Sequence, residues 1–177
     1  QGQQGTVLAG VTTVSSTGSM RIPSGPTENR GGRGRGVMLN ISNPGLTKDN
    51  NYITIATTGN ALDFGDQSLA RYSKGSFASA TRGFDAGGST PTAQTTIEYV
   101  TIMSAGNSSD FGNLSIATTN AGGMSNSTRG AYGAGGISPS PGERNTIDFI
   151  TLASTGNTSD FGDATAARHS CTGTAGR

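Results

Sequence analysis

The chain has no tryptophan and only one cysteine, and 6% of its residues are aromatic. The single thiol, Cys171, cannot form an intrachain disulfide, so stability has to come from strand pairing and oligomerisation. No stretch approaches the roughly 20 consecutive apolar residues that a membrane-spanning helix needs. No basic-then-apolar secretion signal opens the sequence. We therefore expect no membrane partner.

A strong charge of either sign is also missing, because 12 Lys and Arg residues face 11 Asp and Glu residues and the formal net charge is +1. Such a balance produces no electrostatic field that favours nucleic acid or an anionic membrane. Residues 30–36 resemble an arginine-glycine box that binds single-stranded nucleic acid, but no aromatic side chain is interleaved. We expect no nucleic-acid partner and interpret this segment as a flexible junction that touches an acidic patch on a partner.

What the chain has in abundance is glycine, at 29 of 177 positions, and internal repetition. Residues 51–79, 97–126 and 147–172 each run through an apolar-threonine strand, a Gly-Asn turn and an Asp-Phe-Gly triplet. The copies are about 47 residues apart, with a short insertion in the last one, which indicates a repeat protein. The repeated structural positions are Asp63, Phe64, Gly65, Asp110, Phe111, Gly112, Asp160, Phe161 and Gly162, together with the Arg-Gly pairs Arg82-Gly83 and Arg129-Gly130, in register with Arg35.

Alternation along the copies predicts β-strands. Residues 97–102 and 147–152 place apolar groups on both faces of an extended chain, so each strand should lie between two neighbouring sheets. Glycine in each Gly-Asn turn lets the chain reverse. No segment shows helical periodicity, so the sequence predicts an all-β fold.

The repeats begin at Arg35. We therefore divide the chain into an N-terminal arm or linker for docking, residues 1–34, and a β repeat region, residues 35–177. Within the arm, residues 6–14 alternate like a strand, whereas the segment from Arg21 onward is rich in Pro, Gly and Arg and reads as a linker or extended arm. The repeat units are roughly residues 35–81, 82–128 and 129–177.

Each repeated residue type has a structural role that fits its position. An Asp carboxylate can accept turn amides, and the following Phe ring can fill the gap between adjacent sheets. Each Arg is expected to donate to a carboxylate or to turn carbonyls in a neighbouring unit, because its fork suits that role; the alternative is a solvated surface position.

No catalytic set is present. An Asp-Phe-Gly triplet holds Mg²⁺ in kinases, but that chemistry also needs a glycine-rich nucleotide loop, a strand lysine and a separate catalytic Asp. The pairs Asp63/Asp66 and Asp160/Asp163 lack the further oxygens of a Ca²⁺ site. The single His169 has no nucleophile or acid placed beside it by spacing. We expect no enzyme activity, no cofactor and no metal.

The unit that runs from the Arg-Gly pair at Arg82 through the double glycine at Gly87 and the aromatic strand to Asp110 resembles kelch-like repeats. Repeats of this kind are abundant in structural proteins of marine tailed bacteriophages, especially cyanophages. The resemblance covers about residues 35–177 and implies propeller-blade-type units. The first copy is degenerate, and Phe stands where kelch blades often have tryptophan.

The number of units has a consequence. The repeat set is incomplete at about three units, whereas closed propellers have four or more blades. The resemblance therefore implies assembly with copies of the same chain or with other virion proteins, or a place within a longer product.

A second resemblance concerns residues 18–25, Gly-Ser-Met-Arg-Ile-Pro-Ser-Gly, which are similar to a short signature of phage tail-fibre and appendage proteins. It implies a docking arm centred on Met20, Arg21, Ile22 and Pro23. An extended arm can add a strand to an exposed sheet edge of a partner.

Together these features predict a non-catalytic virion structural protein of a tailed phage, displayed on the virion surface as a capsid decoration, knob or tail appendage. The expected partners are capsid or tail subunits and further copies of the chain. The alternative is a module of a phage fibre that binds a carbohydrate or host receptor, with a host-surface glycan as ligand. A cellular kelch-type adaptor is disfavoured, because the chain is short of blades.

Overall fold

A computed structural model describes residues 34–39, 45–137 and 142–175, and the backbone of three short strands that precede them. The described residues form β-strands, turns and loops and no helix, which confirms the all-β prediction. None of them belongs to a helix with the length and hydropathy needed to span a bilayer.

The N-terminal strands form a small antiparallel sheet in the order β1-β2-β3. These are β1 (Val7–Leu8), β2 (Thr12–Val14) and β3 (Met20–Arg21). The single strand predicted over residues 6–14 is thus two short strands, which pair with each other and satisfy their backbone groups locally. Of the predicted docking residues, Met20 and Arg21 lie in β3, while Ile22 and Pro23 lie outside the described residues.

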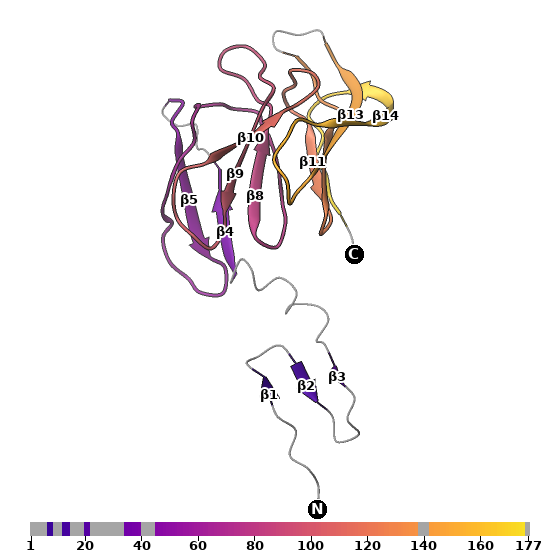
Figure 1. Ribbon diagram of the computed structural model, residues 1–177. Coiled ribbons are helices and arrows are strands. Elements are labelled where there is room, and N and C mark those ends of the chain that lie inside the picture. Colours follow the sequence, from indigo (N-terminus) through magenta and orange to yellow (C-terminus); the bar gives the residue numbers. More distant parts are fainter. Residues whose placement is uncertain are drawn as a thin grey trace, which may run out of the picture.

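Three larger antiparallel sheets make up the body, and Figure 1 shows them following one another across the molecule in chain order. Sheet 1 contains β4 (Arg35–Met38), β5 (Asp49–Thr54) and β6 (Leu62–Asp66). Sheet 2 contains β7 (Gly75–Ala78), β8 (Arg82–Ala86), β9 (Thr96–Thr101) and β10 (Ser109–Asn113). Sheet 3 contains β11 (Gly122–Ser125), β12 (Arg129–Gly133), β13 (Arg144–Thr151) and β14 (Ser159–Arg168).

Each sheet is a meander in which every strand pairs with the next one along the chain. The sheets do not start where the sequence units were drawn. The predicted boundaries at Arg82 and Arg129 fall one strand inside sheets 2 and 3, because β7 pairs with β8 and β11 pairs with β12. Sheets 2 and 3 therefore start 47 residues apart, 122 − 75, which is the spacing of the sequence repeat with a different starting point.

The backbone repeats in detail as well as in outline. The last two strands of every sheet contain a register shift at the triplet, for example between Asp110 and Gly112. A residue in the left-handed region precedes the first strand of sheets 2 and 3, at Ser73 and Asn120, and recurs at Ser170, with φ between 53° and 58°. Such conformations are rare for residues other than glycine, so their recurrence shows that the three copies adopt one backbone path.

The core lies between sheets 2 and 3, where β7 lies against β11. Aromatic and aliphatic side chains from both sheets meet there and form one buried cluster. Gly130 makes the close approach possible, since a Cβ at this position would lie 2.3 Å from the ring of Phe77. The cluster is Phe77, Phe84, Ala86, Ile97, Phe111, Leu114, Ala121, Tyr132, Ile150 and Leu152.

Candidate functional site

The repeated Arg, aromatic and Phe positions form one side-chain stack in each sheet. The guanidinium group lies 4.6 to 4.9 Å from the centroid of the aromatic ring, within the range of a cation–π contact. The same ring meets the Phe edge-to-face at 5.9 to 6.1 Å. The three stacks are Arg35–Tyr52–Phe64, Arg82–Tyr99–Phe111 and Arg129–Phe149–Phe161.

Two of the three arginines also reach the next sheet. Arg35 Nη1 donates to the carbonyl oxygen of Ile102 at 3.1 Å, and Arg82 Nη1 donates to that of Leu152 at 3.0 Å. The acceptors are turn carbonyls, one of the two acceptor types that the sequence left open. Arg129 has the same place in sheet 3, and its side chain is exposed.

Each Gly-Asn turn binds the last strand of the preceding sheet. Between sheets 1 and 2, Gly106 N donates to Phe64 O at 2.6 Å and Ser108 N donates to Asp66 O at 2.8 Å. In return, Asp66 N donates to Asn107 Oδ1 at 3.0 Å. The turn therefore acts as one more short strand along the edge of sheet 1.

The junction between sheets 2 and 3 repeats this pattern bond for bond. Gly156 N donates to Phe111 O at 2.8 Å, and Thr158 N donates to Asn113 O at 2.9 Å. Asn113 N donates to Asn157 Oδ1 at 3.0 Å. Two identical junctions in one chain show that the interface is a property of the repeat.

Glycine in the triplet is required by this contact. A Cβ on Gly65 would lie 2.5 Å from the carbonyl carbon of Gly106, and one on Gly112 would lie 2.2 Å from the carbonyl oxygen of Gly156. No side chain fits between the two backbones at these distances. A Cβ on Gly162, in contrast, would meet nothing within 4 Å.

Sheet 3 therefore ends in an uncovered copy of the interface, which we call the open end face: Arg129, Phe149, Phe161, Gly162 and Asp163. Phe64 and Phe111 are each 2% exposed, but Phe161 is 59% exposed. The prediction that the triplet Phe fills a gap between sheets is wrong for Phe161, because no sheet follows sheet 3 in the described residues.

The triplet carboxylates are exposed and lie in the last strand of each sheet, at its register shift. Asp63 Oδ1 accepts the amide of Gly65 at 3.2 Å, and Asp160 Oδ1 accepts that of Gly162 at 3.0 Å. Asp110 is also exposed. The carboxylates of Asp63 and Asp160 therefore accept amides at the irregular point of a strand, and not in the turn that the sequence predicted.

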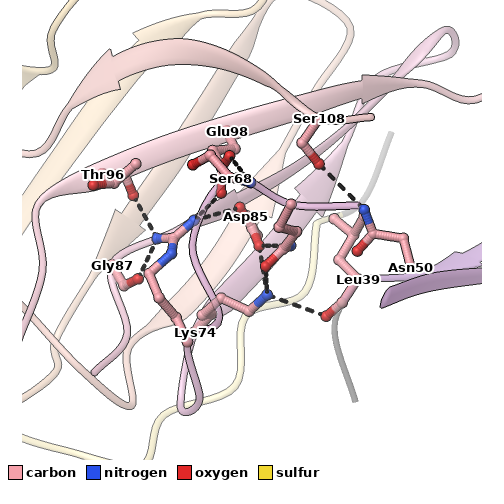
Figure 2. Close-up of polar contacts among 11 residues, drawn as sticks. Leu39, Asn50, Ser68, Lys74, Asp85, Gly87, Thr96, Glu98 and Ser108 are labelled. Atoms are coloured by element: carbon pink, nitrogen blue, oxygen red, sulfur yellow. Dashed lines mark hydrogen bonds and ion pairs between the residues drawn. The ribbon is translucent and has the colours of Figure 1, made fainter. Parts of the chain in front are cut away.

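A second feature, shown in Figure 2, is a buried network of charges that the sequence reasoning did not identify. Arg71 pairs with Asp85 at 3.1 Å and with Glu98 at 2.7 Å, and Lys74 pairs with Asp85 at 2.6 Å. The four side chains are between 0% and 6% exposed. Gln67 adds a hydrogen bond to the Asp85 carboxylate.

The network fastens the connection between sheets 1 and 2. Arg71 also donates to the carbonyl oxygens of Gly87 and Thr96, and Lys74 Nζ donates to Leu39 O at 3.2 Å. Burial lowers the pKa of the Lys74 ammonium, while the neighbouring Asp85 opposes that shift. Two positive and two negative charges balance one another, so the network holds residues 67–74 against β8 and β9.

One signal in the sequence points to this network. Asp85 stands between Phe84 and Ala86, and Glu98 stands between Ile97 and Tyr99, inside strands that are otherwise mostly apolar. Carboxylates in such strands are buried only when they are paired. Their cationic partners come from a loop, and no periodicity marks its position.

In sheet 3 a smaller polar cluster stands in its place. Asp148, which corresponds to Glu98, accepts hydrogen bonds from the amide and hydroxyl of Ser115 at 2.8 and 2.9 Å and from the hydroxyl of Thr158 at 2.9 Å. Across the described ranges, no three His, Cys, Asp or Glu side chains gather in a way that would hold a metal ion.

Comparison with known proteins finds neither a family model nor a curated protein that matches the chain.

Proposed function

We propose that the protein is a non-catalytic structural component of a tailed-phage particle, displayed on the virion surface as a capsid decoration, knob or tail appendage. The phage assignment rests on the resemblance of its repeats and of residues 18–25 to phage structural proteins. The four-stranded meanders of sheets 2 and 3 support a kelch-like, blade-type unit, because a propeller blade is a four-stranded antiparallel sheet.

The observation behind this proposal is the interface between sheets. It is built from backbone hydrogen bonds, glycine contacts and Arg–aromatic stacks, occurs twice, and remains uncovered on sheet 3. These groups hold modules together and provide no acid, base or nucleophile pair. A protein whose repeated feature is a docking surface is suited to assembly.

In this function, residues 1–34 attach the protein to a capsid or tail subunit and residues 35–177 form the protruding body. The test is to delete residues 1–34 in the phage that encodes the chain and to analyse purified particles by mass spectrometry and cryo-electron microscopy. Intact particles should show the β body outside the shell or tail, and the deletion should remove that density. Absence of the full-length chain from purified particles would refute the proposal.

A second function, recognition of a host-surface glycan by a phage fibre, is favoured by one specific feature. A groove of about 310 Å³ lies at the rim between sheets 2 and 3. It is lined by hydroxyl groups of Ser79, Thr81 and Ser127 and by Arg82, which are suitable hydrogen-bonding groups for a sugar. Glycan-array binding by residues 35–177, abolished by Thr81→Val, would establish this function; no binding on the array would reject it.

A further inference from the structure

The open end face is one half of an interface whose other half is present on sheet 1. At both internal junctions, one sheet contributes an Arg, the carbonyl of the triplet Phe, and the backbone of the residue two positions beyond that Phe. The following sheet contributes a turn carbonyl and the three residues of a Gly-Asn turn. On sheet 3, the groups of the first kind, which are Arg129, the Phe161 carbonyl and the backbone of Asp163, have no following sheet against them among the described residues.

On sheet 1, the groups of the second kind, a turn carbonyl and a Gly-Asn turn, are uncovered. Its Gly-Asn turn comprises Gly59, Asn60 and Ala61, which correspond to residues 106–108 and 156–158, and all three are exposed. Ile55, which corresponds to Ile102 and Leu152, offers the carbonyl that an Arg would reach.

Apolar side chains around these groups are exposed only in sheet 1. Ile55 is 68% exposed, against 9% for Ile102 and 3% for Leu152. Ile53 is 37% exposed, whereas its counterparts Val100 and Ile150 are 2% and 4% exposed. In sheet 3, Ile150 and Leu152 pack in the core cluster with Phe77 and Phe84 of sheet 2. Sheet 1 therefore presents at its surface the apolar positions that sheet 3 buries against the sheet before it.

We propose that the open end face of one molecule binds sheet 1 of a second copy of the chain, head to tail. In this contact Arg129 donates to the Ile55 carbonyl, and the Phe161 carbonyl accepts the amide of Gly59. The backbone of Asp163 exchanges hydrogen bonds with Asn60 Oδ1 and the amide of Ala61. The turn then covers the Phe161 ring, as residues 106–108 and 156–158 cover Phe64 and Phe111.

The chain after β14 supports the same arrangement. Asn120 N donates to Ser73 O at 2.8 Å, and Cys171 N, one residue beyond the counterpart of Asn120, donates to Asn120 O at 3.2 Å. The backbone of Gly173 approaches that of Gly122 and Gly123, so residues 172–175 run beside β11 as β11 runs beside β7. These residues occupy the place of the first strand of a further sheet.

Sheet 1 has a matching position for that strand. Among the described residues, β4 is an edge strand, whereas its counterparts β8 and β12 pair with β7 and β11 on the same side. In the head-to-tail contact, residues 172–175 of one copy come to this edge of β4 in the other. Added strand pairing of this kind uses the main chain and needs no special side chains.

A head-to-tail contact uses two different surfaces, so it produces a closed ring or an open chain of copies. The proposal is independent of the phage assignment, since it depends only on the two junctions inside the chain. A free oligomer in solution would support it whether or not the protein is found on a virion, and the virion test can fail without affecting it.

The first experiment measures the mass of the full chain by light scattering after size-exclusion chromatography. We expect a mass of at least two chains of 17.7 kDa. Phe161→Ser should weaken association by at least about tenfold, because it removes the central aromatic contact. Tyr72→Ser is the matched control, since Tyr72 is an exposed aromatic residue at 40% outside both surfaces. A monomer at the highest attainable concentration, or equal effects of the two variants, would overturn the proposal.

The second experiment identifies the surfaces and does not depend on the stability of the Phe161 variant. Asp163→Cys and Asn60→Cys are introduced into separately tagged copies that also contain Cys171→Ser. With copper phenanthroline as oxidant, the two thiols should form a disulfide in the mixture, because the corresponding Asn113 and Asn157 are in hydrogen-bond contact. Asp163→Cys mixed with Thr92→Cys should not crosslink. Crosslinking of Asp163→Cys mainly to itself would show a symmetric contact and reject the head-to-tail arrangement.

Discussion

Gly112 in β10 lies directly against Gly156 of the next sheet, so close that a Cβ on Gly112 would come within 2.2 Å of the Gly156 carbonyl oxygen. The contact joins residues 44 positions apart, 156 − 112, and lies beside the hydrogen bond from Gly156 N to Phe111 O. Gly162 has the same place in sheet 3 and a similar positive φ, +131° against +148°, but no neighbour.

A comparison of Gly112 with Gly162 separates two contributions to the loss of unfolding free energy: the clash with the next sheet and the strain of a positive φ. We expect Gly112→Ala to lose about 3 to 5 kcal/mol of unfolding free energy, because it adds a clash between two backbones to the strain of a positive φ. Gly162→Ala should lose only about 1 to 2 kcal/mol, the strain alone. Urea denaturation at low protein concentration measures both. Equal losses would mean that the sheets separate easily and that the junction contributes little.

Arg82 and Arg129 provide a second matched pair. Arg82→Ala should cost about 1 to 3 kcal/mol, since it removes the hydrogen bond to Leu152 O and the contact with the Tyr99 ring. Arg129→Ala should cost less than about 1 kcal/mol in the monomer, because only the contact with the Phe149 ring is lost. Thermal and urea unfolding followed by circular dichroism compare the two. A larger effect at Arg129 would contradict the assigned junction.

The buried charges predict a large effect at Arg71. Arg71→Met should destabilise the protein by about 3 to 5 kcal/mol, because it leaves Asp85 and Glu98 without their shared cation in a site closed to water. Lys48→Met, at an exposed position, should change the unfolding free energy by no more than about 0.5 kcal/mol. Chemical denaturation provides the measurement. A loss at Arg71 as small as that at Lys48 would show that the network does not secure residues 67–74.

Tyr132 predicts a loss of stability at alkaline pH. Burial raises the pKa of its phenol above the ordinary value near 10, and its hydroxyl donates to Thr118 O at 3.3 Å. A raised pKa means that the folded state holds the proton after the unfolded state has lost it. The resulting stability is present below pH 10 and decreases as the pH rises above it.

The test compares the wild type with Tyr132→Phe between about pH 8 and pH 11. At the lower pH the variant should be about 1 kcal/mol less stable, because one hydrogen bond is lost. The difference should shrink or reverse at the higher pH, where Phe cannot ionise. The lowered pKa of Lys74 acts in the opposite sense: its contribution to stability increases with pH until the pH reaches 10.5, the ordinary pKa of a lysine. This contribution is the same in both proteins, so it cancels when their unfolding free energies are subtracted. If the pKa of Tyr132 were not raised, the difference in unfolding free energy would stay constant with pH.

The sequence predicted much of the fold because its signals are local. Alternation over residues 97–102 and 147–152 matches β9 (Thr96–Thr101) and most of β13 (Arg144–Thr151). The Gly-Asn turns lie between consecutive strands, as their backbone freedom requires. The sheets begin one strand before the unit boundaries at Arg82 and Arg129, because a repeat has no intrinsic starting point and only strand pairing shows where a sheet begins.

The polar network was missed for the opposite reason. Asp85 and Glu98 are visible in their strands, but Arg71 and Lys74 lie in a connection whose path follows no regular period. Their pairing spans 11 to 27 residues and depends on how sheets 1 and 2 pack. No local pattern contains that information.

By itself, the sequence determined that this chain is an all-β repeat with three copies of one triplet, because strand, turn and glycine preferences act over a few residues. Only the tertiary structure decided that Phe64 and Phe111 are buried whereas Phe161, in the same triplet, is 59% exposed. Burial depends on what lies against a side chain, and a covering turn from the next sheet is present for the first two rings and absent for the third among the described residues.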